Sequence, residues 1–170
     1  MIIRRETPAD AAAVRTLTLA TSHHPHSEKT EELKLRDALR TGDAWIPALS
    51  LLAEDDAGEL LGHTLACRGS IGSTQVPELT LLGVLPTHRR RGVGSALVHA
   101  TLAAADALDV PLVVVLGPPD FYRRFGFRPS TDLGIAGPEP GWGDFFQVRA
   151  LNAYRPEVRG DFVYPAAHSS

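Results

Sequence analysis

The chain has 170 residues, of which 44% are hydrophobic and 22% are charged, and its formal net charge is −3. This size and composition are ordinary for a globular protein with a sizeable core, so we expect residues 1–170 to form a single domain. A slightly acidic chain lacks the overall positive field that recruits nucleic acid, and we expect no nucleic-acid partner.

Cysteine usage and hydropathy limit the cellular compartment. The one cysteine, Cys67, excludes an internal disulfide framework and suits a reducing environment. No apolar run approaches the length of a membrane span, and residues 1–5 lack the apolar region of a signal peptide. We therefore expect a cytoplasmic protein without a membrane partner.

The N-terminal half alternates strand and helix signals. A short apolar run predicts a strand at residues 2–6, and Thr7 followed by a proline predicts the start of a helix. A second helix is expected at residues 27–40. Two further strands, at residues 49–53 and 60–67, are separated by an Asp-Asp-Ala-Gly turn, which predicts a β-hairpin.

Histidines at positions 23, 24 and 26 lie between the two predicted N-terminal helices. Such a cluster can indicate a metal site, but the loop offers no carboxylate or thiolate at metal-ligand spacing. We therefore expect no bound metal.

The C-terminal half continues the alternation, with strands expected at residues 78–84, 111–116, 145–151 and 160–164 and helices at residues 92–108 and 120–125. Asp120 is expected to cap the shorter helix. The unit from Glu78 to Leu116 should form a right-handed crossover between neighbouring parallel strands. One mixed α/β domain accounts for this order of elements.

The most informative stretch is the basic, glycine-punctuated loop at residues 89–95, between a predicted strand and a predicted helix. Gly92 and Gly94 lack a Cβ, and the first helical N–H groups and the helix dipole favour an anion there. The loop has no lysine of a P-loop, and Leu97 stands where a dinucleotide fingerprint needs a small residue. The pattern predicts a phosphate site, with a solvated basic turn as the alternative.

Two motifs resemble the GNAT N-acetyltransferase superfamily. The spacing Arg89-x-x-Gly92-x-Gly94 is similar to its pyrophosphate loop, and residues 120–127 (Asp-Phe-Tyr-Arg-Arg-Phe-Gly-Phe) resemble its aromatic segment. Residues 116–122 further resemble a poorly characterised bacterial branch of predicted acetyltransferases. The resemblance covers most of the chain and implies a single α/β domain whose mixed central sheet is splayed between two parallel strands and flanked by helices.

The resemblance also implies acetyl-CoA as co-substrate. The loop amides would hold its pyrophosphate, and exposed backbone groups at the splayed strand end would pair with its pantetheine arm. The cofactor-binding residues implied are Leu82, Gly83, Val84, Arg89, Arg90, Arg91, Gly92, Val93, Gly94, Ser95 and Tyr122.

Three catalytic roles follow from the same resemblance. Tyr122 matches the residue that protonates the CoA sulfur, with an aromatic anchor as the alternative. The Val84 N–H would stabilise the oxyanion. Glu78 stands six residues before Val84, so both side chains should share one strand face, and some family members carry a general-base glutamate at this spacing. A solvated glutamate is the alternative, with water or a histidine as the base.

The sequence therefore predicts an acetyl-CoA-dependent N-acetyltransferase that acts on a primary amine of a small molecule or peptide by direct attack on the thioester. The alternative is a non-catalytic acyl-CoA-binding or regulatory domain of the same fold. The acceptor is not named by these motifs, because acceptor pockets are built from variable loops. The apolar C-terminal strands are compatible with a homodimer.

Overall fold

A mixed β-sheet forms the centre of the computed structural model, which describes residues 1–21, 34, 37–38 and 41–164. The strands are β1 (Ile2–Arg5), β2 (Leu51–Glu54), β3 (Leu60–Ile71), β4 (Thr74–Val84), β5 (Leu112–Leu116), β6 (Arg128–Pro129), β7 (Ile135–Ala136), β8 (Phe146–Ala150) and β9 (Gly160–Val163). Their order in the main sheet is β1-β2-β3-β4-β5-β8-β6, and β9 pairs with both β3 and β7. The pairs β4–β5 and β7–β9 are parallel, and the other pairs are antiparallel.

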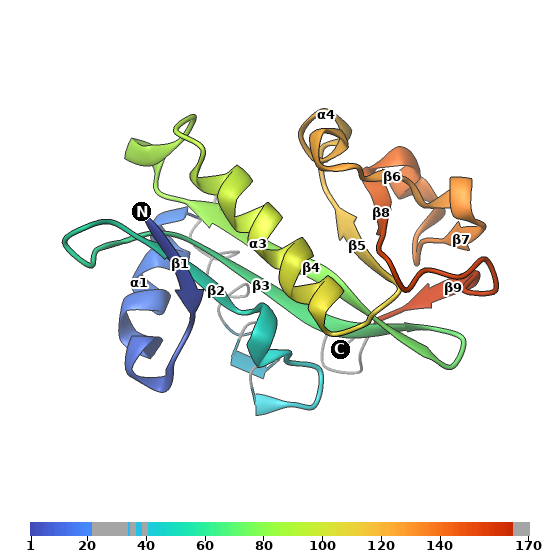
Figure 1. The fold of residues 1–170 in the computed structure, drawn as a ribbon, viewed down its shortest axis with the longest axis horizontal. Helices are drawn as coiled ribbons and strands as arrows, with labels where there is room; N and C mark the ends of the chain where they lie inside the picture. The colour runs from blue at the N-terminus through green and yellow to red at the C-terminus, as the bar shows by residue number, and fades with distance from the viewer. Residues whose placement is uncertain (22–33, 35–36, 39–40, 165–170) are drawn as a thin grey trace.

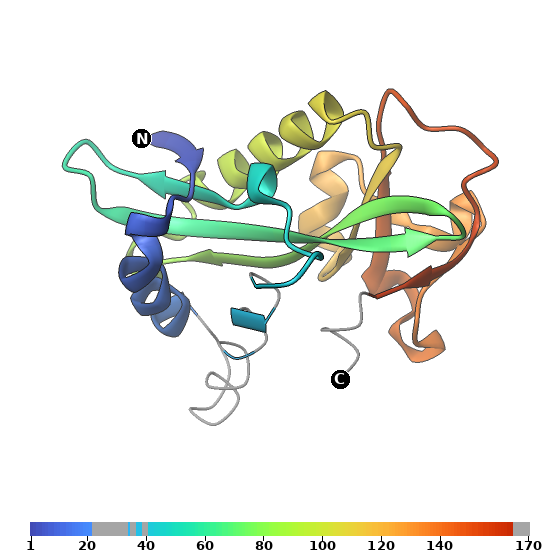
Figure 2. The same cartoon turned by 90° about the horizontal axis from the view of Figure 1, so that it is seen from below.

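Helices cover both faces of this sheet. They are α1 (Ala11–Thr21), α3 (Val93–Ala107) and the short α4 (Pro119–Tyr122), with 3-10 turns at Pro8–Asp10, Pro47–Leu49, Pro86–His88, Arg123–Phe125, Ser130–Leu133 and Pro140–Phe145. α1 and α3 lie on opposite faces of the sheet (Figures 1 and 2). None of the helices in the described part of the chain is long and apolar enough to span a bilayer.

The helix predicted after Thr7 is confirmed, although its first turn is a 3-10 helix. Asp10 fixes this start, because its carboxylate accepts the Thr7 N–H at 2.7 Å and pairs with the Arg4 guanidinium at 2.9 Å. Most of the helix predicted at residues 27–40, and the histidines at 23, 24 and 26, lie outside the described residues.

The predicted hairpin at residues 49–67 is also confirmed. Its turn contains Gly58, whose φ of +80° favours glycine. The strands β3 and β4 extend further than predicted and are joined by a second tight turn at Gly72, whose φ is +59°. Polar residues along this extension hid its strand character in the sequence.

The crossover β4–α3–β5 is present, with β4 and β5 as parallel neighbours. α3 lies along one face of the sheet, where Leu97, Val98 and Leu102 are buried against the strands. The pairing of the two strands is short, because only Glu78–Val114 and Leu79–Val115 are in register. Beyond these pairs the strands separate, which leaves a gap at their carboxyl ends.

The chain after β5 contains one correction. Asp120 does not cap the short helix, because α4 starts at Pro119 and Pro118 is its N-cap residue. Asp120 lies in the first turn and pairs with Arg123. Gly126, with a φ of +87°, ends the following 3-10 turn, so the helical segment stops after Phe125, as the predicted range of residues 120–125 expected. The two-residue strands β6 and β7 carry too few residues for an alternating pattern, and they were not predicted.

Candidate active site

A cleft of about 850 Å³ opens where β4 and β5 separate. Its described lining residues come from four parts of the chain and are Thr21, Leu82, Gly83, Val84, His88, Arg89, Arg90, Gly92, Gly94, Ser95, Pro118, Phe121, Tyr122 and Arg124. After Leu79, the edge of β4 that faces β5 has no partner strand among the described residues. Backbone N–H and C=O groups on such an edge can pair with an extended, peptide-like ligand.

The N-terminus of α3 forms one end of the cleft. The first helical hydrogen bond in this region is donated by the Ala96 N–H to the Gly92 carbonyl at 3.0 Å. The amides of Val93, Gly94 and Ser95 therefore precede the helical ladder, and the helix dipole adds partial positive charge beside them. This is the arrangement that binds phosphate at helix N-termini.

The two loop glycines serve different purposes. Gly92 has a φ of +84°, and no described atom lies within 4 Å of where its Cβ would be, so conformation requires glycine there. A Cβ at Gly94 would instead lie 3.6 Å from a Val84 methyl group and 3.8 Å from the Phe121 ring. Any larger residue at position 94 would therefore project between α3 and the wall formed by α4. Both are ordinary van der Waals distances, so the close approach of a phosphate oxygen at Gly94 stays a prediction.

The arginines of the loop divide between two environments. Arg89 and Arg90 line the cleft, and the Arg89 Nε donates to the Val84 carbonyl at 3.3 Å. Arg90 has a φ of +62°, a left-handed conformation that is uncommon outside glycine. Arg91 and Val93 are not among the described lining residues, and Val93 is buried in the core under α3. Only their backbone amides remain candidates for the site.

Tyr122 forms the opposite wall. Its ring is 6% exposed and packs edge-to-face on Phe121 and Phe127, with ring centroids 4.9 and 5.5 Å apart. A Cβ at Gly117 would lie 2.5 Å from this ring, so glycine at that position makes room for it. Burial raises the pKa of the Tyr122 hydroxyl to about 12, which keeps it protonated at neutral pH. The hydroxyl is therefore available as a proton donor at neutral pH.

Glu78 lies elsewhere, and the expectation that it shares a face with Val84 is wrong. A β-bulge leaves Thr80 unpaired, because Leu81 pairs with Leu65 while Leu79 pairs with Ala66. The extra residue reverses the alternation, so Val84 faces α3 and Glu78 faces the α1 side of the sheet. The described residues that line the cleft do not include Glu78.

The Glu78 carboxyl is nevertheless an unusual group. It is 5% exposed, and burial raises its pKa to about 7, while contacts with Tyr164 and Thr80 act in the opposite direction. The Thr80 hydroxyl lies 3.3 Å from one carboxylate oxygen. A carboxyl group with this pKa can exchange a proton near neutral pH.

Five lining residues were not assigned to the site from the sequence: Thr21, His88, Pro118, Phe121 and Arg124. The Arg124 guanidinium stacks on the Phe121 ring at 4.8 Å, which joins charge and aromatic surface on the wall facing α3. Both belong to the aromatic motif, whose position beside the loop could have suggested them. Thr21 carried no signal, because its place in the cleft arises only from the packing of α1 on the sheet.

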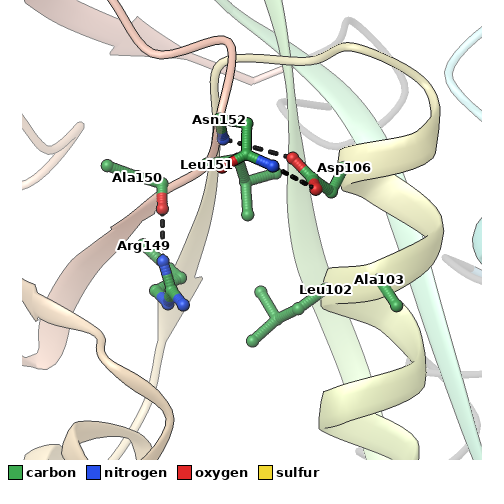
Figure 3. A pocket seen from close by; sticks show the side chains of 7 residues that line it. All are labelled: Leu102, Ala103, Asp106, Arg149, Ala150, Leu151 and Asn152. Carbon is green, nitrogen blue, oxygen red and sulfur yellow. Dashed lines mark hydrogen bonds between the residues drawn. The ribbon is translucent and has the colours of Figure 1, made fainter.

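A second hollow, of about 320 Å³, lies between the C-terminal end of α3 and the chain that follows β8 (Figure 3). Its polar groups bind one another: Asp106 accepts the Asn152 backbone N–H at 3.1 Å and the Asn152 side-chain amide at 2.9 Å. The Arg149 guanidinium donates to backbone carbonyls, including that of Phe125 at 2.8 Å. The bonds between Asp106 and Asn152 fasten α3 to the chain that follows β8, so this polar cluster is structural.

Comparison with known proteins identifies related acetyltransferases. A family model described as an acetyltransferase (GNAT) domain matches residues 47–129. The uncharacterized N-acetyltransferase YhbS of Escherichia coli K12 is 31% identical over 156 residues, which cover 89% of this chain and 87% of the relative. A mycothiol acetyltransferase of Clavibacter michiganensis is 38% identical over 120 residues, which cover 66% of this chain and 37% of that protein.

Solved structures similar to this chain are also GNAT-family acetyltransferases. The crystal structure of E. coli YhbS in complex with CoA superposes with a TM-score of 0.86 at 26% identity, covering 99% of this chain and 92% of that one. A GNAT-family acetyltransferase from Brucella melitensis in complex with acetyl-CoA has a TM-score of 0.75 at 31% identity, covering 98% and 97% of the two chains.

Proposed function

The chain belongs to the GNAT acetyltransferase family, and from that premise we propose that it transfers an acetyl group from acetyl-CoA to a primary amine of a small molecule or peptide. It is an acyltransferase, and acetyl-CoA is its co-substrate. The observation that carries the proposal is the cleft, in which the α3 N-terminus, the unpaired edge of β4 and Tyr122 meet.

The shape of the cleft suits an extended thioester. The amides of residues 93–95, with Arg89 and Arg90 beside them, would bind the pyrophosphate oxygens. The pantetheine arm would then run along Leu82–Val84, where its amides can pair with the open strand edge. This path leads the thioester towards Tyr122, which lines the same cleft.

Direct attack by the amine has three chemical requirements, and we assign a group to each. The Val84 N–H stabilises the oxyanion that forms on the carbonyl oxygen. Tyr122 donates a proton to the departing CoA sulfur, since its hydroxyl stays protonated at neutral pH. Glu78 accepts the proton of the incoming ammonium group through water, because its carboxyl lies outside the cleft wall.

Two measurements test the proposal. Isothermal titration with acetyl-CoA should give saturable binding of one molecule per chain. Thiol release from acetyl-CoA should then accelerate with at least one member of a panel of alkylamines, polyamines, amino-acid amides and peptides. Binding without turnover on any amine would instead identify a non-catalytic acyl-CoA-binding domain, and absence of binding would contradict both functions.

The remaining expectations stay predictions. A homodimer and a cytoplasmic location are compatible with the fold. Cys67 is a buried free thiol, and burial raises its pKa to about 11, so a thiolate forms only in strongly alkaline solution. Such a thiol is compatible with a reducing compartment.

A further inference from the structure

Gly83 lies under two polar side chains on the face of β4 that α1 covers. A Cβ at Gly83 would lie 2.9 Å from the His63 Nε2 and 2.8 Å from the Thr21 Cβ, and closer still to the Thr21 hydroxyl. The missing side chain therefore makes room for a hydroxyl and an imidazole directly on the strand. Gly83 and Thr21 both line the cleft, and His63 lies behind this wall in contact with Thr21.

The pair is buried and in contact. Thr21 is 6% exposed and His63 is 2% exposed, and the Thr21 Oγ1 lies 3.4 Å from the His63 Nε2. Hydrogen bonds of catalytic groups are often this long before substrate binds, and they shorten in the complex. His63 is in register with Gly83 across β3 and β4, which fixes the imidazole beside the cleft.

Glu78 is more remote from the same point. It precedes Gly83 by five residues, which is roughly 16 Å along an extended strand. A water chain can connect it to the solvated ammonium group of an entering substrate. It is poorly placed for a proton released at the thioester itself, which the cleft wall beside Gly83 can reach directly.

Amide formation from an ammonium substrate removes two protons from nitrogen. The first leaves before the attack, and the second leaves as the C–N bond forms and the nitrogen becomes positively charged. We propose that Thr21 and His63 form a relay for this second proton. The inference rests on the proposed function and adds a pair of residues to it.

The nitrogen lone pair forms the C–N bond, the carbonyl π electrons move to oxygen, and the C–S bond breaks as the intermediate collapses. Nitrogen gives its proton to the Thr21 oxygen while the Thr21 hydroxyl proton moves to the His63 Nε2, which leaves an imidazolium. The thiolate takes a proton from Tyr122, and solvent returns each group to its starting state.

Substitutions at Thr21 separate the relay from packing. Thr21→Val keeps the side-chain volume and removes the hydroxyl, so kcat should fall at least tenfold with the best amine of the panel. Thr21→Ser keeps the hydroxyl and should stay within about threefold of the wild type. The Kd of acetyl-CoA should change less than about twofold in both variants, because position 21 lies outside the loop that we assign to the cofactor phosphates.

His63→Gln tests the second member, since an amide cannot accept the proton. If the two residues act as one unit, the double variant Thr21→Val/His63→Gln should be no slower than the slower single variant, within about threefold. The matched control is Thr18→Val, one turn earlier on α1. The Thr18 hydroxyl is buried and donates to the Val14 carbonyl at 2.8 Å within its own helix, so this variant should keep the wild-type kcat.

The outcomes distinguish failure of the relay from failure of the proposed acetyltransferase function on which it rests. A wild type that turns over an amine while Thr21→Val keeps kcat within threefold overturns the relay and leaves the acetyltransferase intact. The relay is also overturned if the fold-losses of kcat in the two single variants multiply in the double variant. A wild type that binds acetyl-CoA but acetylates no amine contradicts the proposed function, and the relay with it. Because Thr21→Val preserves volume, it decides the question even where a substitution of His63 unfolds the chain.

Discussion

Tyr122 combines aromatic packing with a hydroxyl group, and one substitution separates the two. Tyr122→Phe keeps the ring contacts with Phe121 and Phe127 and the fit against Gly117. If the hydroxyl protonates the CoA sulfur, kcat should fall roughly a hundredfold with little change in the Kd of acetyl-CoA. The measurement is steady-state turnover of the best amine beside calorimetric titration of acetyl-CoA.

The alternative for Tyr122 makes the opposite prediction. An aromatic anchor needs only the ring, so Tyr122→Phe would then keep kcat within threefold of the wild type. Truncation to alanine is uninformative, because it adds a cavity beside the cleft and lowers the stability as well. A near-normal Phe variant would return Tyr122 to a packing role and leave the thiolate to depart unassisted.

Glu78 gives a prediction about the pH dependence of the rate. A general base works only when deprotonated, and the pKa of this carboxyl is about 7, so turnover should fall as the pH drops below 7. Glu78→Gln should lower kcat at least tenfold and remove this acidic limb. The affinity for acetyl-CoA should be unchanged, because Glu78 does not line the described cleft. A Gln variant with the wild-type pH profile would assign the base to another group.

At the scale of elements, the N-terminus of α3 offers the sharpest test of cofactor binding. Gly94→Asp would place a carboxylate beside the amides that we assign to the pyrophosphate, between Val84 and Phe121. Steric block and charge repulsion should together abolish measurable acetyl-CoA binding by calorimetry, while the far-ultraviolet circular dichroism stays unchanged.

A second glycine supplies the control for this variant. Gly141 has no described atom within 4 Å of its Cβ position and does not line the cleft, so Gly141→Asp adds the same charge outside the proposed binding site. It should bind acetyl-CoA like the wild type. Retained affinity in a folded Gly94→Asp variant would remove the phosphate assignment from this loop.

The elements also show which sequence signals were reliable. The crossover from β4 through α3 to β5 was predictable, because a long apolar helix face and an entirely apolar strand leave few alternatives. The side of the sheet that Glu78 faces was not predictable. The two-residue alternation of a strand is broken wherever a bulge inserts an extra residue, as Thr80 does in β4. Nothing in the run Glu-Leu-Thr-Leu-Leu distinguishes a bulged strand from a regular one.

At the scale of the whole molecule, the site is assembled from segments far apart in sequence. The loop and Tyr122 were predictable because each is a contiguous motif whose chemistry is visible in its own residues. Thr21 and His63 were not, since α1 must first dock on the sheet before their side chains meet over Gly83. Sequence patterns therefore indicated the side of the cleft that we assign to the cofactor, but not the wall on the α1 face.

The stability of the whole fold should depend on pH through Glu78. Below pH 4.5 its carboxyl is protonated in both the folded and the unfolded chain. Between pH 4.5 and 7 the unfolded chain releases this proton while the folded chain retains it, so stability falls as the pH rises. A pKa raised from 4.5 to about 7 corresponds to a loss of about 3 kcal/mol across this window, with no further change above it.

Glu78→Gln isolates this contribution, because every other titrating group, including Asp10 with its lowered pKa, is common to both proteins. Urea unfolding between pH 4.5 and 8.5 should show the free energy of unfolding of the variant gaining about 3 kcal/mol on the wild type as the pH rises. The gain should be complete near pH 8, since the folded wild type is by then forced to bury a charged carboxylate. Parallel curves for the two proteins would mean that the carboxyl is solvated in the folded state, and they would weaken its case as a base near neutral pH.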